Sequence, residues 1–122
     1  MTVYAGMFAK SAKAGNQPPL QLPESWAKAK PKLKGTTPMN LVSTNDIIGG
    51  NSGSPLVNQR GEVVGLIFDG NIQSLPNNFM YRSELDRAVS VHSVGLLEAL
   101  RKVYDAGPLV EELLQTDATG RK

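Results

Sequence analysis

A glycine-rich turn at residues 49–55, of sequence GGNSGSP, constrains this 122-residue chain more than any other feature. Glycine and proline this close together end regular structure, so the turn must separate two elements. Alternation of apolar and polar residues over 39–44 predicts a strand before it. Leu56 and Val57, a punctuating segment at 58–61, and a second apolar run predict a hairpin after it. We therefore expect one serine, Ser52, to lie on a turn between strands.

The segments after the hairpin predict one further strand and then helices. The continuous apolar run Val63–Phe68 is typical of a strand buried on both faces, a polar loop is expected at 74–78, and residues 87–91 alternate as a strand. After Ser93, apolar residues recur at helical spacing. Gly107 and Pro108 are expected to stop that helix, and a second amphipathic piece covers 109–114.

The N-terminal third of the chain is less regular. Residues 1–15 mix aromatic and small residues and fit either a strand or a short helical turn. A short helix is expected over 23–30, ending before Pro31, and the lysine-rich segment 30–35 is interpreted as an exposed connector. Trp26, the single tryptophan, is expected to serve packing.

The composition is that of an ordinary globular segment, with 40% hydrophobic and 20% charged residues. A net charge of +2, without aromatic residues interleaved in a basic stripe, gives no reason to expect a nucleic-acid partner. The absence of cysteine excludes disulfides and thiolate metal sites, and we expect neither a metal nor a cofactor. No apolar run approaches the roughly 18 residues that span a bilayer.

Ser52 is the candidate nucleophile. A serine hydroxyl needs a base to take its proton and donors to stabilise the oxyanion that forms. The flanking glycines meet the second need, because they let backbone N–H groups point at a bound carbonyl. The first need is unmet, since the chain has one histidine, His92. The neighbouring Ser54 is expected to be structural.

Several segments together resemble the bacterial dipeptidyl-peptidase 7 and 11 family of chymotrypsin-like serine peptidases. The match is dense from about residue 41 to residue 114. The segments that carry it are 43–55 (STNDIIGGNSGSP), 58–62 (NQRGE), 65–71 (GLIFDGN), 87–91 (RAVSV) and 96–104 (LLEALRKVY).

The resemblance implies a mainly β fold, part of a double β-barrel, followed by a C-terminal helix. Residues 1–40 would then be a partial upstream barrel or connector, 41–92 the nucleophile-bearing segment of the second barrel, and 93–114 a helical segment. Residues 115–122 are expected to be a disordered tail. A chain of this length is short for two barrels, and its start lacks a signal peptide, so we interpret it as a fragment of a longer protein.

The family removes dipeptides from the free N-terminus of peptides with a Ser-His-Asp triad. By resemblance, Ser52 is the nucleophile, the backbone N–H groups of Gly50 and Ser52 form the oxyanion hole, and Asp69 binds the substrate's α-ammonium. Gly70 stands in the specificity pocket, where relatives that prefer acidic residues carry an arginine. Glycine should leave this pocket roomy and uncharged, which predicts a hydrophobic residue before the cut.

Two further residues need an interpretation. His92 occupies a place where family members more often have an acidic residue, so it is expected to be a partly exposed histidine at a strand end. The triad histidine and aspartate of the family lie upstream, outside this chain. Asp46 is expected to order the loop or the base of the pocket, although an acidic pocket would favour basic substrates.

Two alternatives remain open. The chain could belong to another trypsin-like peptidase, such as a glutamyl endopeptidase, which shares the serine turn but not the segment 68–71 or the helix after 93. Without a base, the isolated chain could instead be a non-catalytic barrel fragment or binding module. We expect the free chain to self-associate through open strand edges. The full-length enzyme is expected in the periplasm, cell envelope or extracellular space, as a homodimer.

Overall fold

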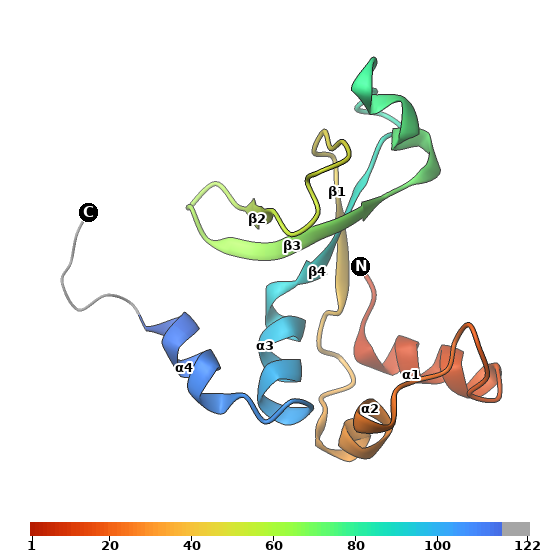
Figure 1. Ribbon diagram of the computed structural model, residues 1–122, viewed down its shortest axis with the longest axis vertical. Helices are drawn as coiled ribbons and strands as arrows, with labels where there is room; N and C mark the ends of the chain where they lie inside the picture. The colour runs from red at the N-terminus through yellow and green to blue at the C-terminus, as the bar shows by residue number, and fades with distance from the viewer. Residues whose placement is uncertain (116–122) are drawn as a thin grey trace.

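The computed structural model describes residues 1–115. An N-terminal helical part precedes four strands, and two helices follow them (Figure 1). In chain order the elements are α1 (Tyr4–Lys13), α2 (Glu24–Ala29), the 3-10 helix η1 (Lys30–Lys32), β1 (Asn40–Ser43), β2 (Pro55–Val57), β3 (Val63–Gly70), the 3-10 helix η2 (Ile72–Asn78), β4 (Ala88–His92), α3 (Ser93–Lys102) and α4 (Gly107–Leu114).

The four strands form one antiparallel sheet in the order β1-β4-β3-β2. The long strand β3 is its spine, because Leu66 lies opposite Pro55 of β2 and opposite Val91 of β4. The pairing of β3 with β4 is interrupted between Ile67 and Asp69, which leaves Phe68 as an extra residue. Such bulges bend a strand and redirect its side chains. After the bulge, Asp69 and Gly70 pair with Val89 and Ala88 in a register shifted by one residue.

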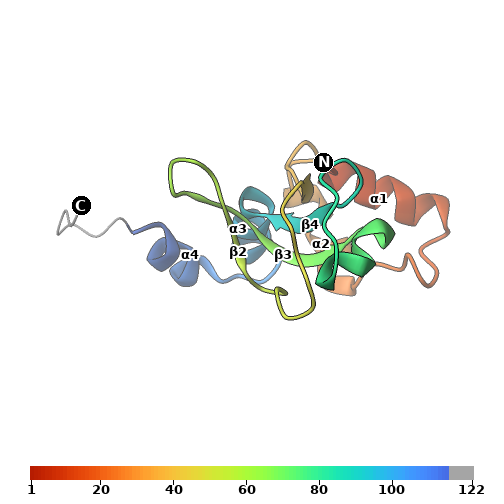
Figure 2. The same ribbon diagram turned by 90° about the horizontal axis from the view of Figure 1, so that it is seen from above.

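The helices and the 3-10 helix η2 lie at opposite ends of the sheet. In Figure 1, α1, α2 and α3 gather below the strands, whereas η2 follows the far end of β3 at the top. Seen from above in Figure 2, α4 extends beyond α3 and away from α1. The chain therefore carries two separate regions, a helical base and a loop-rich end that follows β3.

An aromatic cluster ties the N-terminal helices to α3. Tyr4 is only 1% exposed, and its hydroxyl donates a hydrogen bond to the carbonyl of Gly95 at 2.5 Å. The ring of Trp26 packs edge-on against Tyr4 at 5.4 Å, and its Nε1 donates to the Tyr104 hydroxyl at 3.1 Å. The expectation that Trp26 serves packing is thus confirmed. Gly95 is required here, because a Cβ would lie 2.3 Å from the carbonyl oxygen of Pro38.

Two expectations about the elements are corrected. Residues 4–13 form a helix, so α-helices hold more residues than strands, and the described part is mixed rather than mainly β. Within residues 1–115 the sheet is open, with β1 and β2 as its edges, and its place in a larger double β-barrel stays a prediction. β3 is buried only at its centre, because Val63 and Phe68 are half exposed in an open sheet.

The ends of the helices differ from the sequence prediction in one respect. α3 already ends at Lys102, and Gly107 and Pro108 begin α4 instead of stopping α3. Proline suits the first turn of a helix because its missing N–H has no partner there in any case. The predicted division at residues 40 and 92 stays a prediction about a longer protein, and the predicted disordered tail lies outside the described residues. No helix within residues 1–115 is long and apolar enough to cross a bilayer.

Candidate active site

The glycine-rich turn is held on β3 by backbone hydrogen bonds. The N–H of Gly53 donates to the carbonyl of Ile67 at 2.7 Å, and the N–H of Ile67 donates to that of Ser54 at 3.0 Å. The Asn51 side chain closes the other side, because its Oδ1 accepts from the N–H of Ile48 at 2.8 Å. Ser52 thus lies exposed at the tip of a turn that is anchored on both sides.

Backbone conformation at this turn depends on two glycines. Gly50 has a φ of +99° and Gly53 a φ of +88°, values that side-chain-bearing residues rarely adopt. The N–H groups of Asn51, Gly53 and Ser54 are used in hydrogen bonds. Those of Gly50 and Ser52 have no partner within the part of the chain that the structure describes. Two donors beside a serine hydroxyl are what an oxyanion hole requires.

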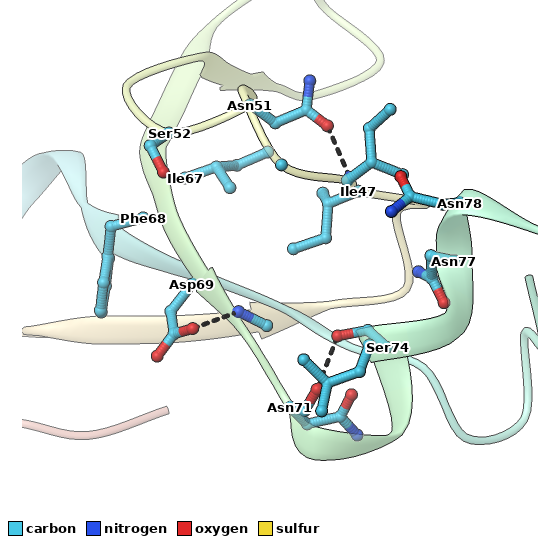
Figure 3. A pocket seen from close by; sticks show the side chains of 14 residues that line it. Ile47, Asn51, Ser52, Ile67, Phe68, Asp69, Asn71, Ser74, Asn77 and Asn78 are labelled. Carbon is cyan, nitrogen blue, oxygen red and sulfur yellow. Dashed lines mark hydrogen bonds between the residues drawn. The ribbon is translucent and has the colours of Figure 1, made fainter.

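Ser52, Asp69 and Gly70 line one cavity of about 330 Å³. Its walls come from the turn, from the end of β3 and from η2, as the labelled side chains of Figure 3 show. The lining is apolar and amide-rich and carries a single charged side chain, that of Asp69. It comprises Ile47, Ile48, Gly49, Asn51, Ser52, Ile67, Phe68, Asp69, Gly70, Asn71, Ser74, Leu75, Asn77 and Asn78.

The carboxylate of Asp69 lies directly after the bulge in β3. Its Oδ1 accepts a hydrogen bond from the N–H of Gly70 at 2.8 Å, and the side chain is otherwise exposed (Figure 3). A carboxylate can accept about four hydrogen bonds, so it retains capacity for a cation. The bulge thus leaves a negative charge and a serine hydroxyl in the same cavity.

Gly70 lines the cavity as expected, but the space beside it is not open. A Cβ at this residue would lie 2.3 Å from Ser74 Oγ and 3.1 Å from Ile47 Cδ1. The expectation of a roomy pocket is therefore corrected at this point. The glycine lets η2 approach β3 closely, and the volume of the cavity lies elsewhere along its walls.

The segment before the turn is tethered to η2 and to the residues that follow it. Asn77 is 8% exposed, and its Nδ2 donates to Asp46 Oδ1 at 3.1 Å. The hydroxyl of Tyr81 donates to the carbonyl of Thr44. Asp46 is thus engaged in ordering the loop, the first of its two expected roles. No sequence signal pointed to Asn77, which stands in the expected polar loop at 74–78, or to Tyr81, which follows that loop.

His92 serves α3 and does not line the cavity. The N–H of Val94 donates to His92 Nδ1 at 3.2 Å, so the imidazole caps the N-terminus of the helix. The residue ends β4, as the sequence predicted, and it is half buried. Because the chain has no other histidine, it offers no imidazole to Ser52. Within residues 1–115, no cluster of histidine and carboxylate side chains could hold a metal ion.

Comparison with known proteins places this site in context. A family model described as peptidase S46 matches residues 1–115. Dipeptidyl-peptidase 7 of Phocaeicola vulgatus is 38% identical over 79 residues, which are 65% of this chain and 11% of the relative. An Asp/Glu-specific dipeptidyl-peptidase of Shewanella putrefaciens is 38% identical over 84 residues, which are 69% of this chain and 12% of the relative.

The fold is similar to that of a solved structure. The crystal structure of Porphyromonas endodontalis DPP11 matches with a TM-score of 0.80 at 24% identity, over 94% of this chain and 18% of that chain. At that identity the likeness supports the fold alone. The chain spans about a tenth of the length of the curated relatives that it matches.

Proposed function

Because the chain belongs to the peptidase S46 family, we propose that it is the nucleophile-bearing segment of a serine dipeptidyl aminopeptidase. The resemblance to this dipeptidyl-peptidase family is confirmed by the family model and by relatives that include dipeptidyl-peptidase 7 and an Asp/Glu-specific dipeptidyl-peptidase. The observation that carries the proposal is that Ser52 and Asp69 line one cavity. An exopeptidase of this kind needs a nucleophile and, at a fixed distance from it, an anion for the substrate's free N-terminus.

The reaction would proceed through an acyl-enzyme. Ser52 Oγ attacks the carbonyl carbon of the substrate's second residue, and its proton passes to a base that this chain does not supply. The N–H groups of Gly50 and Ser52 stabilise the oxyanion. The amine of the shortened peptide leaves with a proton, and water then releases the dipeptide from Ser52.

Asp69 would define where the substrate is cut. Its carboxylate forms an ion pair with the α-ammonium, so only a free N-terminus is held while the second carbonyl reaches Ser52. Blocking that amine by acetylation removes the charge and should abolish cleavage. A glutamyl-endopeptidase-like enzyme, by contrast, would cleave blocked and free peptides alike.

We propose that the enzyme prefers a substrate with a hydrophobic residue, such as Leu, Phe or Met, immediately before the cleaved bond. The support is the lining of the cavity, in which the described residues include several isoleucines and no cation. A substrate carboxylate buried there would lack a partner. The Asp/Glu-specific relatives favour the opposite preference, so the assignment depends on the cavity alone.

The assay is made on the full-length protein with fluorogenic dipeptides. Substrates ending in Leu and in Asp are compared, each with a free and with an acetylated N-terminus. Higher kcat/KM for the free Leu substrate, lost in Ser52→Ala, is the expected result. Faster cleavage after Asp would overturn the hydrophobic preference, and equal cleavage of acetylated substrates would overturn the exopeptidase.

A second candidate applies to the 122-residue chain by itself. Its single histidine caps α3, so the isolated chain would act as a non-catalytic fragment or binding module. A serine-directed fluorophosphonate should label Ser52 in the full-length protein and not in the isolated chain. Rapid stoichiometric labelling of the isolated chain would exclude this candidate. Location in the periplasm or cell envelope, and a homodimer, remain proposals for the full-length protein.

A further inference from the structure

The contact between Gly70 and Ser74 is unusually close. A Cβ placed on Gly70 would lie 2.3 Å from Ser74 Oγ, 3.1 Å from Ile47 Cδ1 and 3.5 Å from the carbonyl oxygen of Arg87. The backbone itself does not demand glycine, because Gly70 is not among the residues with positive φ. Its neighbours therefore decide which side chains residue 70 can carry, and Ser74 Oγ lies closest of all.

Hydrogen bonds hold Ser74 Oγ in this place. The hydroxyl donates to the carbonyl of Asn71 at 2.6 Å, and the Ser74 N–H donates to the same oxygen at 3.0 Å. Asn71 is itself fixed, because its Nδ2 donates to the carbonyl of Leu85 at 2.7 Å and its Oδ1 accepts from the N–H of Arg87 at 3.0 Å. Figure 3 shows Ser74 reaching from η2 toward Asn71 in the cavity wall. The hydroxyl can leave only by giving up its own hydrogen bond.

We propose that Ser74 is a specificity-determining residue of this cavity. Its hydroxyl fills the volume that a side chain at residue 70 would need, so it excludes a side chain, and in particular a cationic one, from residue 70. The catalytic consequence rests on the proposed function, whereas the steric coupling between residues 70 and 74 does not.

Removing one atom should release the restriction. The third-nearest atom to the Cβ position lies at 3.5 Å, so Ser74 Cβ is at least that distant and is no obstacle. In Ser74→Ala the closest remaining atom is Ile47 Cδ1, the end of a flexible side chain. Residue 70 should then accept a side chain, and an arginine there would offer its guanidinium to a carboxylate in the cavity.

A double-mutant cycle tests the coupling without any enzyme assay. Gly70→Ala, Ser74→Ala and the double variant of the full-length protein are unfolded in urea. Gly70→Ala should lower the folding equilibrium constant more when Ser74 is present than when residue 74 is alanine. The difference between the two effects should be roughly two- to tenfold, the effect of one displaced hydrogen bond. Gly6→Ala is the control, because nothing lies within 4 Å of its Cβ position and it should show no coupling to Ser74. If Gly70→Ala fails to fold, the double variant should fold.

The catalytic consequence is tested on the full-length protein. Gly70→Arg and Gly70→Arg/Ser74→Ala are compared on free dipeptide substrates ending in Asp and in Leu. The double variant should raise the Asp-to-Leu ratio of kcat/KM at least about tenfold over the single variant, the discrimination that one well-placed charged pair supplies.

The two experiments separate the two proposals. Additive effects in the cycle, a double variant that does not fold, or a single Gly70→Arg that switches preference as fully as the double would each overturn the role of Ser74. If the unmutated full-length protein had no peptidase activity but residues 70 and 74 were coupled, the proposed function would be overturned. The steric role of Ser74 would still stand.

Discussion

Glu98 on α3 binds Lys34 and Thr37, which lie in the segment before β1. Removing its carboxylate should therefore destabilise the fold. Its Oε1 accepts from the N–H of Lys34 at 2.8 Å and from Lys102 Nζ at 2.8 Å. Its Oε2 accepts from the hydroxyl of Thr37, a residue that is 5% exposed. The perturbation that we choose is Glu98→Ala.

The three partners contribute unequally. Burial of Thr37 means that its hydroxyl would lose its acceptor, at about 1–3 kcal/mol. The pair with Lys102, four residues along the helix, joins the mostly buried Glu98 to a 41% exposed lysine and adds about 0.3–0.5 kcal/mol. The N–H of Lys34 regains water. The free energy of unfolding should therefore fall by about 1.3–3.5 kcal/mol, a large part of the roughly 5–15 kcal/mol of an ordinary domain.

Urea unfolding of the variant and of a matched control measures this difference. Glu24→Ala removes an exposed pair with Lys28 of the same helical spacing, and it should cost about 0.5 kcal/mol or less. Equal losses in the two variants would refute the reasoning, since the effect would then reflect surface charge alone and not the buried hydroxyl of Thr37.

The same carboxylate predicts how stability depends on pH. Burial opposes the ionisation of Glu98, but hydrogen bonds from Lys102, Thr37 and the N–H of Lys34 outweigh it and lower the pKa below its ordinary value of 4.5. A lowered pKa in the folded state means that the contribution is present above pH 4.5 and is lost as the pH falls through the lowered pKa. Glu98→Gln should weaken that acid dependence.

Four further outcomes are expected. Gly50→Ala forces a side chain onto a φ of +99° and disturbs an oxyanion donor, so kcat should fall roughly 10²-fold, whereas Gly61→Ala, strained at +81° in the distant hairpin, should leave kcat unchanged. Asp69→Asn should raise KM for substrates with a free N-terminus far more than it lowers kcat for the same substrates. His92→Asn keeps a side-chain acceptor at the start of α3, so it should preserve both stability and kcat; a loss of kcat with an unchanged melting temperature would assign the imidazole a catalytic role. The isolated chain should self-associate in sedimentation velocity, because the edge residues Val42 and Val57 are 53% and 48% exposed, and a monodisperse monomer would contradict this.

The strands were predictable because their apolar residues alternate or cluster over short, bounded runs. The helix α1 was not, since its N-cap is Val3, which makes no side-chain cap hydrogen bond, so the usual start signal is absent. The burial of β3 was overestimated for a different reason. An apolar run predicts contact on both faces, but the ends of this strand in an open four-stranded sheet have too few neighbours.

Local signals also fail where one residue suits two roles. Pro108 was interpreted as the end of a helix, yet proline is equally suited to the first turn of the next one, and here it begins α4. In the same way, Pro76 and the polar residues around it predicted a loop, whereas they form the 3-10 helix η2. Composition shows that such segments are not strands, but it does not show against which neighbours they pack.

The candidate site illustrates this difference most clearly. Ser52 and Asp69 could be selected from the sequence because each stands in a short motif with a chemical reason for its residue type. Asn77 and Ser74 could not be selected in this way, because their importance comes from their contacts. Asn77 binds Asp46, which is distant in the sequence, and Ser74 lies against Gly70 across a turn of the chain. The nucleophile side of the cavity is therefore encoded locally, whereas the wall that faces it is set by side chains of η2 held against β3 and the preceding loop. It follows that substrate preference in this segment should respond to substitutions in η2 that leave the serine turn unchanged.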